Sequence, residues 1–235
     1  MDVMSFDVLK ADMHSHLIPG IDDGAQVMEE SIDMIRGLHE LGFSKLVTTP
    51  HVMSDYYRNT PEIILGGLEK VRAELKAQNI PVELEAAAEY YLDHEFSEMI
   101  GKEKLLTFGN NHLLFELPFL AEPQALNSVI FNLQTSGYKP VLAHVERYSY
   151  WHMEYDRYQE LHDKGVILQL NIMSLTGHYS PEVKKISERL IDDGLISLLG
   201  TDTHGVRHLG LLERATTSAW FHKLVESGKL LNTQL

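Results

Sequence analysis

The chain of 235 residues contains no cysteine, which excludes disulfide bonds and thiolate metal ligands. It also lacks any apolar run near the roughly 20 residues that a transmembrane helix requires, so no membrane insertion is expected. Residues 1–10 carry no basic segment ahead of an apolar stretch and do not resemble a signal peptide. Together these absences favour a cytoplasmic protein.

Basic residues are scarce, because 20 Lys and Arg face 34 Asp and Glu and leave a formal net charge of −14. Nucleic-acid backbones are bound through clustered Lys and Arg, so no nucleic-acid partner is expected. A small or peptidic anion could still bind if metal ions reversed the local potential. Hydrophobic content of 44% and charged content of 23% are typical of a globular protein. The length suits one domain spanning residues 1–235.

Short apolar runs alternate with helical patterns along the chain. Seven strands are expected, at residues 8–13, 45–48, 82–88, 113–115, 141–143, 166–170 and 195–199. Two of the intervening helices are expected to begin at Thr60-Pro61 and Ser180-Pro181, where a capping residue precedes proline. Alternation of this kind predicts a parallel sheet with helices outside it. We therefore predict an α/β fold, a barrel of about seven strands.

Histidine and acidic residues recur where six of the seven expected strands end. In a barrel the carboxyl ends of the strands meet on one face, where such folds build active sites. Nine side chains are candidate metal ligands: His14, His16, Asp23, His51, Glu89, Glu116, His144, Asp202 and His204. A lone histidine in an apolar segment is more often a satisfied core residue. Two histidines at positions i and i+2 share one face of a strand, which favours ligands instead.

Glu89 and Glu116 each follow an apolar run. Buried carboxylates are rarely left without a partner, and a salt bridge to Lys or Arg is the alternative to a metal. Few basic residues lie near these positions in the sequence. The other eight histidines fall mostly on expected helices or loops and are interpreted as surface residues. His178 and His208 are the expected exceptions, because they follow the last two strands.

Nine nitrogen and oxygen ligands are too many for one ion and suit two or three divalent ions. Without thiolates, this ligand set suits manganese, iron or zinc. Three divalent ions would carry more positive charge than the four carboxylates carry negative charge. The pocket would then be net positive within an acidic protein, which favours a phosphate ester as substrate.

Several motifs occur in a fixed order, namely DMHSHLIPGIDDGA, TTPHV, the two glutamates, AHVERY and GTDTHG. The set resembles the signature of the polymerase-and-histidinol-phosphatase (PHP) superfamily. Within it, HSHLIPGIDDGA and AHVERY resemble the bacterial manganese-dependent protein-tyrosine phosphatases of capsule and exopolysaccharide synthesis. The resemblance runs from about Asp12 to His204. It implies a distorted (β/α)7 barrel of PHP type, with the metal site at the C-terminal ends of the strands.

The resemblance also implies roles for single residues. His14, His16, Glu89 and Asp202 would hold one metal, Glu89 would bridge to a second ion with Glu116 and His144, and Asp23, His51 and His204 would complete a third site. Asp12 would be a hydrogen-bond acceptor at the strand end and not a ligand. Manganese is the implied metal, and the implied partner is a phosphotyrosine protein, the tyrosine-rich tail of a bacterial tyrosine autokinase.

The expected chemistry follows from these parts. Two ions about 3.5–4 Å apart can share a hydroxide that is a nucleophile at neutral pH. Arg147 is the first candidate to bind the phosphoryl oxygens and Arg207 the second, because the planar guanidinium can bind two oxygens at once. For either arginine a surface ion pair is the alternative. Asp202 is a catalytic candidate as well as a ligand.

A tyrosinate leaving group has a pKa near about 10 and needs little protonation, so the lack of an evident general acid is best tolerated by an aryl ester. Residues 53–58, which include Tyr56, Tyr57 and Arg58, are either an aromatic and basic rim for the phosphotyrosine ring or an ordinary exposed loop.

Three alternatives remain. A histidinol-phosphate phosphatase or other small-molecule phosphoesterase would use the same chemistry on another substrate. A metal-dependent amidohydrolase would typically carry a bridging lysine on a middle strand, where this chain has Glu89 and Glu116. A scaffolding module that has lost the reaction would be expected to have lost ligand positions, and all nine are present.

Overall fold

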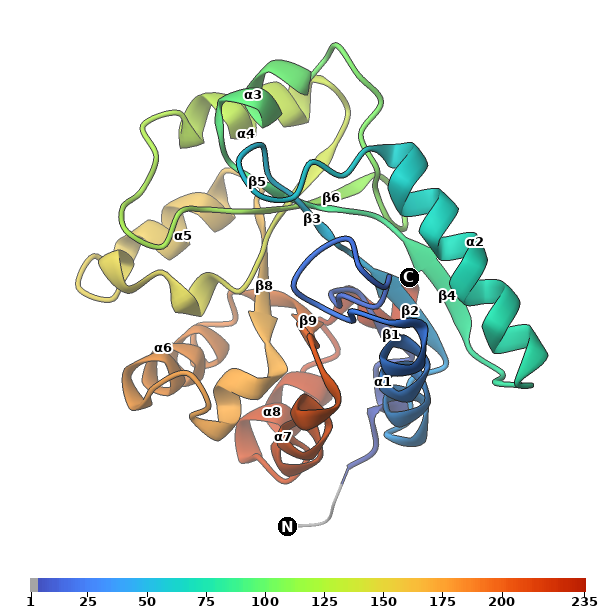
Figure 1. Ribbon diagram of the computed structural model, residues 1–235. Helices are drawn as coiled ribbons and strands as arrows, with labels where there is room; N and C mark the ends of the chain where they lie inside the picture. The colour runs from blue at the N-terminus through green and yellow to red at the C-terminus, as the bar shows by residue number, and fades with distance from the viewer. Residues whose placement is uncertain (1–3) are drawn as a thin grey trace.

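The computed structural model describes residues 4–235. Residues 1–3, which begin the expected domain and the segment inspected for a signal peptide, lie outside the described residues. Strands and helices alternate along the described chain (Figure 1). The strands are β1 (Ala11–Asp12), β2 (Lys45–Thr48), β3 (His51–Val52), β4 (Glu83–Ala86), β5 (Glu89–Tyr91), β6 (His112–Glu116), β7 (Lys139–Leu142), β8 (Ile167–Asn171) and β9 (Ile196–Gly200). The helices are α1 (Met28–Glu40), α2 (Pro61–Ala77), α3 (His94–Met99), α4 (Leu126–Thr135), α5 (Asp156–Asp163), α6 (Pro181–Asp192), α7 (Leu209–Ala215) and α8 (Ala219–Glu226).

The strands pair in parallel, which confirms the predicted α/β class with a parallel sheet. They form two sheets, in the orders β1-β2-β4 and β3-β5-β6-β7-β8-β9. A closed barrel of about seven strands is therefore not confirmed. Two strand paths continue past the expected strands after a break, at Thr49-Pro50 between β2 and β3 and at Ala87-Ala88 between β4 and β5, so each path contributes to both sheets. Proline has no N–H to donate to a sheet ladder, which explains the first break.

The first and last strand paths meet beyond the ends of β1 and β9. Ser15 and Thr203 form an isolated parallel bridge, and the N–H of His16 donates to the carbonyl oxygen of Thr203 at 3.0 Å. The N–H of Asp202 likewise donates to the carbonyl oxygen of His14 at 2.7 Å. These contacts bring the first sequence motif, which contains His14, next to the last one, which contains Asp202.

Helices α2 and α6 begin at the capping residues that the sequence predicted. Thr60 caps α2 by accepting from the N–H of Ile63, and Ser180 caps α6 by accepting from that of Val183. The strand expected at residues 8–13 is shorter, because residues 6–8 form a 3-10 turn capped by Ser5. Helix α3, which Asp93 caps, was not predicted.

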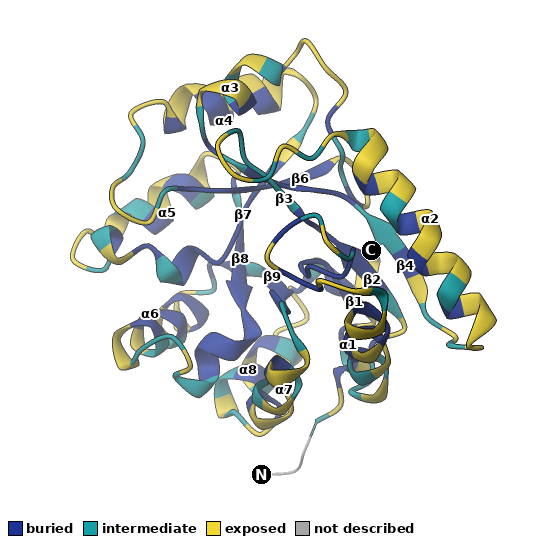
Figure 2. Cartoon of the chain, viewed as in Figure 1, coloured by how far each residue is buried: buried dark blue, intermediate teal, exposed yellow. Residues whose placement is uncertain are grey.

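The helices surround the strands, with their buried faces inward and exposed faces outward (Figure 2). The larger apolar core includes residues from all eight helices and from most of the strands. A smaller one, which we call the inner cluster, consists of Met13, Val47, Ala87, Phe108, Leu114, Val141, Ala143 and Leu198, with Leu231 and Leu235 packed against it. Along each strand path its residues precede the candidate ligands. In the part of the chain that the structure describes, no helix has the length and apolar character of a membrane span.

Candidate metal centre

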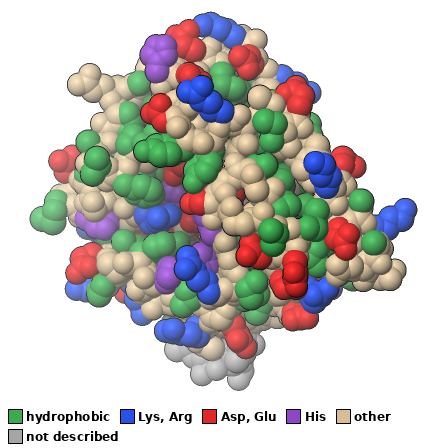
Figure 3. Space-filling view, viewed as in Figure 1, with side chains coloured by type: hydrophobic (Ala, Val, Ile, Leu, Met, Phe, Trp, Pro, Cys, Tyr) green, Lys and Arg blue, Asp and Glu red, His purple; other side chains and the backbone are tan. Residues whose placement is uncertain are grey.

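All nine candidate ligands lie together at the carboxyl ends of the strands. Their donor atoms form four overlapping groups, each within 4.8 Å: His16, Asp23, His51 and His204; His14, His144 and Asp202; His14, His16 and Glu89; and His51, Glu89 and Glu116. Figure 3 shows histidine side chains gathered around a hollow near the middle of the molecular face, beside Lys and Arg side chains. The structure therefore brings together all nine side chains that the sequence offered as candidates.

The Glu89 carboxylate lies at the centre of the cluster. Its Oε2 is 3.1 Å from His14 Nε2 and 3.2 Å from His51 Nδ1. The same oxygen is 3.5 Å from His16 Nε2, while Oε1 is 3.1 Å from His144 Nε2. One fully buried carboxylate thus faces four imidazoles.

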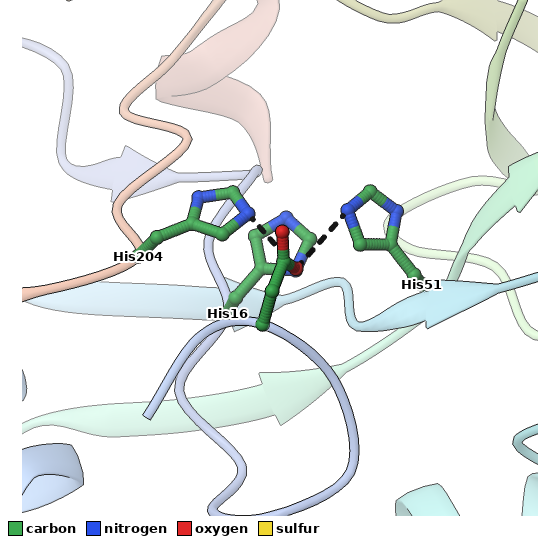
Figure 4. Close-up of side chains that lie close together, drawn as sticks. His16, His51 and His204 are labelled. Atoms are coloured by element: carbon green, nitrogen blue, oxygen red, sulfur yellow. Dashed lines mark ion pairs between the residues drawn. The ribbon is translucent and has the colours of Figure 1, made fainter. Parts of the chain in front are cut away.

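A second carboxylate closes the outer side of the cluster. Asp23 Oδ1 lies 3.5 Å from His51 Nε2 and 3.4 Å from His204 Nε2. Figure 4 shows these two rings pointing at one carboxylate from opposite sides, with His16 behind it. The Asp23 side chain is 53% exposed, so this group opens to the solvent.

Several donor atoms in the cluster are buried and make no well-directed hydrogen bond. They are His14 Nε2, His16 Nε2, His51 Nδ1 and Glu89 Oε2, although the last lies 3.1–3.5 Å from the other three. A buried polar atom left unpaired costs about 1–3 kcal/mol, so four that face one another require an explanation. A cation bound among them would satisfy all four. The residues present therefore fit divalent metal ions.

Hydrogen bonds on the far sides of the rings fix which nitrogen faces the cluster. His14 Nδ1 lies 3.0 Å from Gln169 Oε1, which also accepts from the N–H of His144 at 2.9 Å. His16 Nδ1 lies 2.8 Å from Asp22 Oδ2. If each Nδ1 donates to its oxygen, each Nε2 keeps a lone pair for a metal, as histidine ligands usually do.

Two ligands sit at sharp turns of the backbone. His144 follows β7 with φ of 34° and Asp202 follows β9 with φ of 51°, both in the left-handed region that non-glycine residues seldom adopt. Such strain persists where the surroundings hold it and is frequent at functional sites. Gly200 ends β9 beside His14, and a Cβ there would lie 2.7 Å from His14 Cβ. Only glycine therefore allows β9 to pass so close to the His14 side chain.

The carboxylates dominate the electrostatics of the cluster in the absence of metal. Burial by itself would lower the pKa of His14, but the charges of Glu89 and Asp202 raise it to about 9. Burial opposes ionisation of Glu89 and Asp202, yet the neighbouring histidines hold the pKa of both well below the ordinary carboxyl range. A hydrogen bond with His204 lowers the pKa of Asp23 to about 2. The cluster therefore holds ionised carboxylates at neutral pH and attracts cations.

Further residues support the ligands, and sequence reasoning found only one of them. Asp12 accepts from Thr201 N at 2.9 Å and from Thr201 Oγ1 at 2.8 Å, the acceptor role expected of it. Asn171 Nδ2 donates to Asp202 Oδ2 at 2.7 Å. Gln169 and Asn171 lie two apart on β8, the one expected strand that offers no ligand. Two amide residues at positions i and i+2 of an apolar strand were the signal in the sequence that could have identified them.

The two arginines differ in how firmly they are held. Arg147 Nη1 lies 3.2 Å from Asp202 Oδ2, and its guanidinium carbon lies 4.7 Å from the Phe119 ring centre and 4.4 Å from that of Tyr179. These contacts fix the planar group between two aromatic rings at the cavity wall. Arg207 is exposed at the same cavity.

The metal cluster forms the base of a cavity of about 770 Å³, which we call the metal cavity. Its wall includes Arg147, Arg207, Tyr56 and Tyr57. The Tyr57 ring stacks on His51 at 5.6 Å, so the two tyrosines of the expected aromatic and basic rim line this cavity, but Arg58, its basic residue, does not. His178 and His208 line it too, the exceptions foreseen among the remaining histidines. His112 was expected at the surface, but it begins β6 and is only 8% exposed.

The grouping of ligands differs in part from the one that the resemblance implied. His16 lies with Asp23, His51 and His204 as well as with His14 and Glu89. His144 groups with His14 and Asp202, although its Nε2 also lies 3.7 Å from Glu116 Oε2. Membership of the cluster agrees at all nine positions. The division of ligands among ions therefore stays a proposal.

Comparison with known proteins gives a consistent result. Residues 10–211 match the family model described as capsular polysaccharide synthesis, CpsB/CapC. The chain is 29% identical over 229 residues to the tyrosine-protein phosphatase YwqE of Bacillus subtilis, covering 94% of this chain and 90% of that protein. It is 26% identical over 196 residues to the putative tyrosine-protein phosphatase CapC of Staphylococcus aureus, covering 83% and 77%.

Solved structures agree with these relatives. A structure described among those of YwqE from Bacillus subtilis and CpsB from Streptococcus pneumoniae, unique metal-dependent tyrosine phosphatases, matches with a TM-score of 0.81 and 28% identity. That match covers 96% of this chain and 95% of the other. A histidinol phosphate phosphatase from Lactococcus lactis matches with a TM-score of 0.55 and 12% identity, covering 88% and 93%, which shows a shared fold alone.

Proposed function

Because the chain belongs to the capsular polysaccharide synthesis family CpsB/CapC, we propose that it is a metal-dependent protein-tyrosine phosphatase acting on phosphotyrosine in proteins. One observation supports this most strongly: nine candidate ligand side chains cluster together, several of them with unpaired buried donor atoms, and six of the nine line a cavity whose wall also holds two arginines. The arrangement suits hydrolysis of a phosphate ester. Its biological context would be the regulation of capsular or exopolysaccharide synthesis.

The proposed cofactor is two or three divalent ions, with manganese favoured and iron or zinc as alternatives. His14, His16, Glu89 and Asp202 would hold one ion, Glu116 and His144 would share a second with Glu89, and Asp23, His51 and His204 would hold a third. When bound, the ions would turn water into a nucleophile at neutral pH and polarise the phosphoryl oxygens. The close contacts of Glu89 with four histidines support its bridging role.

The remaining roles belong to charged side chains of the cavity wall. Arg147 would bind two phosphoryl oxygens, since its guanidinium is held flat between Phe119 and Tyr179. Arg207 would add a second positive charge from the rim. Asp202 would act together with the metal site and with Arg147, because it faces His14 on one side and Arg147 on the other. A tyrosinate leaves without help from a strong general acid, which suits this cavity.

We also propose the finer features that the sequence predicted. Residues 1–235 would act as one domain. The strand paths would form a distorted seven-stranded barrel, and the Ser15–Thr203 bridge between the first and last paths supports this arrangement. The partner would be a bacterial tyrosine autokinase with a phosphorylated tyrosine-rich tail. The proposed location is the cytoplasm, in keeping with a chain that has no cysteine.

A substrate comparison on the metal-reconstituted protein tests this function. We expect kcat/KM to be highest for a phosphotyrosine peptide and lower for alkyl phosphates, histidinol phosphate among them, with activity lost after chelation. Faster turnover of histidinol phosphate would assign the chain to the small-molecule phosphatases. Hydrolysis of amide substrates without phosphatase activity would contradict the proposal altogether.

A further inference from the structure

A second cavity of about 760 Å³ adjoins the metal cavity and contains none of the nine candidate ligands. Both cavities are lined by Met53 and Asp93. We call the second cavity the side groove. It lies among the loop after β3, the start of α2, helix α3 and residues 103–106. In Figure 1 the loop that leads from β3 to α2 runs below α3.

Residues 53–59 form a partition between the two spaces. Tyr56 and Tyr57 line the metal cavity, while Ser54, Arg58 and Asn59 line the side groove. The partition is closed by paired backbone hydrogen bonds between Met53 and Tyr57, each 2.9 Å. A substrate segment that leaves the metal cavity over this partition would enter the side groove next.

Hydrogen bonds fix both walls of the side groove. Asp93 Oδ2 accepts from the N–H of Ser54 at 3.0 Å, and Asp93 Oδ1 accepts from that of Phe96 at 2.8 Å. One carboxylate thus ties the partition to helix α3. On the opposite wall, the Tyr90 hydroxyl accepts from the N–H of Leu106 at 2.8 Å. The groove is therefore preformed, which lowers the entropy cost of binding.

The chemistry of the side groove differs from that of the metal cavity. Its apolar lining residues are Val52, Met53, Pro61, Leu65, Phe96, Met99, Leu105 and Leu106. Four acidic residues, Glu62, Asp93, Glu95 and Glu103, also line it, against two basic ones, Arg58 and Lys104. Leu65 is 42% exposed although it is a large apolar side chain. Such a surface suits an apolar side chain accompanied by a basic one.

We propose that the side groove binds the peptide segment beside the phosphotyrosine of a protein substrate, taking an apolar side chain with a neighbouring Lys or Arg. This inference rests on the proposed phosphatase function and adds the part of the substrate that is recognised. The phosphate would enter the cavity that cations make positive, and the basic flank would meet the acidic groove. Free phosphotyrosine cannot reach the groove and gains nothing from it.

Leu65→Ser and Ile63→Ser provide a matched pair for the test. Both residues belong to α2 and are similarly exposed, at 42% and 44%, but only Leu65 lines the groove. The substrates are free phosphotyrosine and a set of phosphotyrosine peptides in which a Leu-Lys pair is moved through the flanking positions of a Gly/Ser background. We expect one placement of the pair to raise kcat/KM of the unaltered protein over the background peptide.

For that peptide, Leu65→Ser is expected to lower kcat/KM about tenfold, mainly through KM, since loss of an apolar contact in a pocket typically costs about tenfold or more in kcat/KM. Turnover of free phosphotyrosine should not change, and Ile63→Ser should change neither. Glu103→Gln should reduce the advantage in kcat/KM that a peptide with the Leu-Lys pair has over a peptide with Leu but no Lys. Glu98→Gln, outside the groove, is the control and should leave that advantage unchanged. This second pair keeps the test decisive if Leu65→Ser proves unstable.

Three results would overturn the proposal. The peptides could show no dependence on the Leu-Lys pair, Leu65→Ser could leave that dependence intact, or sedimentation could show that Leu65→Ser abolishes self-association while peptide kinetics stay the same. The last would assign the groove to a second copy of this chain. Failure of the phosphatase function is separable, because fluorescence anisotropy measures binding of the unphosphorylated Leu-Lys peptide, and its loss in Leu65→Ser, without any hydrolysis.

Discussion

The same strand paths carry two buried clusters of opposite character. The inner cluster, which includes Met13, Leu114 and Leu198, is apolar and packed. The metal cluster follows it along the chain, with His14, Glu116 and Asp202 at positions soon after those residues. Apolar side chains are satisfied by contact alone, whereas the imidazoles and carboxylates leave buried donor atoms unpaired. One end of the strands is thus complete as folded, and the other requires cations.

The largest effect is expected from Glu89→Gln. The amide keeps the shape but cannot bridge two ions with a full charge, so transition-state stabilisation by metal should be lost and kcat should fall about 10³-fold or more. Elemental analysis should show fewer bound ions per chain. Glu85→Gln, on β4 and paired with Lys45 outside the cluster, serves as the control and should keep both activity and metal. Full metal content and activity in Glu89→Gln would contradict the bridging role.

Stability measurements separate the two clusters. Leu198→Ala, in the inner cluster, should lower the free energy of unfolding by about 2–5 kcal/mol with or without chelator, because it leaves a cavity. Chelation of the unaltered protein should remove about 4 kcal/mol if the metal was present at roughly 1,000 times its Kd. For a chain of this size each kcal/mol shifts Tm by about 2–4 °C. An unfolding temperature that chelation leaves unchanged would contradict metal binding in the native state.

Arg147→Ala changes the cavity without removing a ligand. Loss of a positioned donor to the phosphoryl oxygens should lower kcat by about 10²-fold, and Arg207→Ala should have a smaller effect because that side chain is exposed. Metal content should stay the same in both variants. The outcome against this account is an Arg207→Ala defect that exceeds that of Arg147→Ala in steady-state kinetics on a phosphotyrosine peptide.

Gln169→Met tests the residues that orient the ligands. It removes the acceptor for His14 Nδ1 and for the N–H of His144, and metal affinity should fall about 10–100-fold. Isothermal titration with Mn²⁺ measures this directly, and Gln159→Met at an exposed position of α5 is the control. Equal affinities in the two variants would show that the hydrogen bond to Gln169 does not matter for binding.

The pH dependence should have opposite signs for the two states of the site. The pKa of His14 is raised from 6.5 to about 9 in the absence of metal, so this histidine stabilises the metal-free protein fully below pH 6.5 and loses that contribution as pH rises through about 9. A metal must displace the proton, so its apparent affinity should rise about tenfold per pH unit for each proton released over the same window. Metal titrations between pH 6 and 9 that show no slope would contradict this coupling.

The sequence was informative where a residue type and its position in a strand act together. His14, Glu116 and Asp202 follow apolar strands, and parallel strands bring their carboxyl ends to one face, so the cluster could be predicted. The second strand path resumes as β3 after Pro50, and this could not be predicted, because β3 is stabilised by pairing with β5, which is distant in the sequence. A closed barrel was predicted from the alternation of elements, the recurrence of candidate ligands at strand ends and the family resemblance, and none of these says where the hydrogen-bond ladders break. Gln169 and Asn171 are neutral amides whose partners are fixed only by tertiary structure.

The most direct test of the metal cluster is anomalous diffraction from crystals of the protein grown with Mn²⁺. The account predicts two or three anomalous peaks among the donor atoms of the nine side chains, one of them in contact with Glu89. Crystals with ordered His14, Glu89 and Asp202 side chains and no anomalous density between them would contradict it.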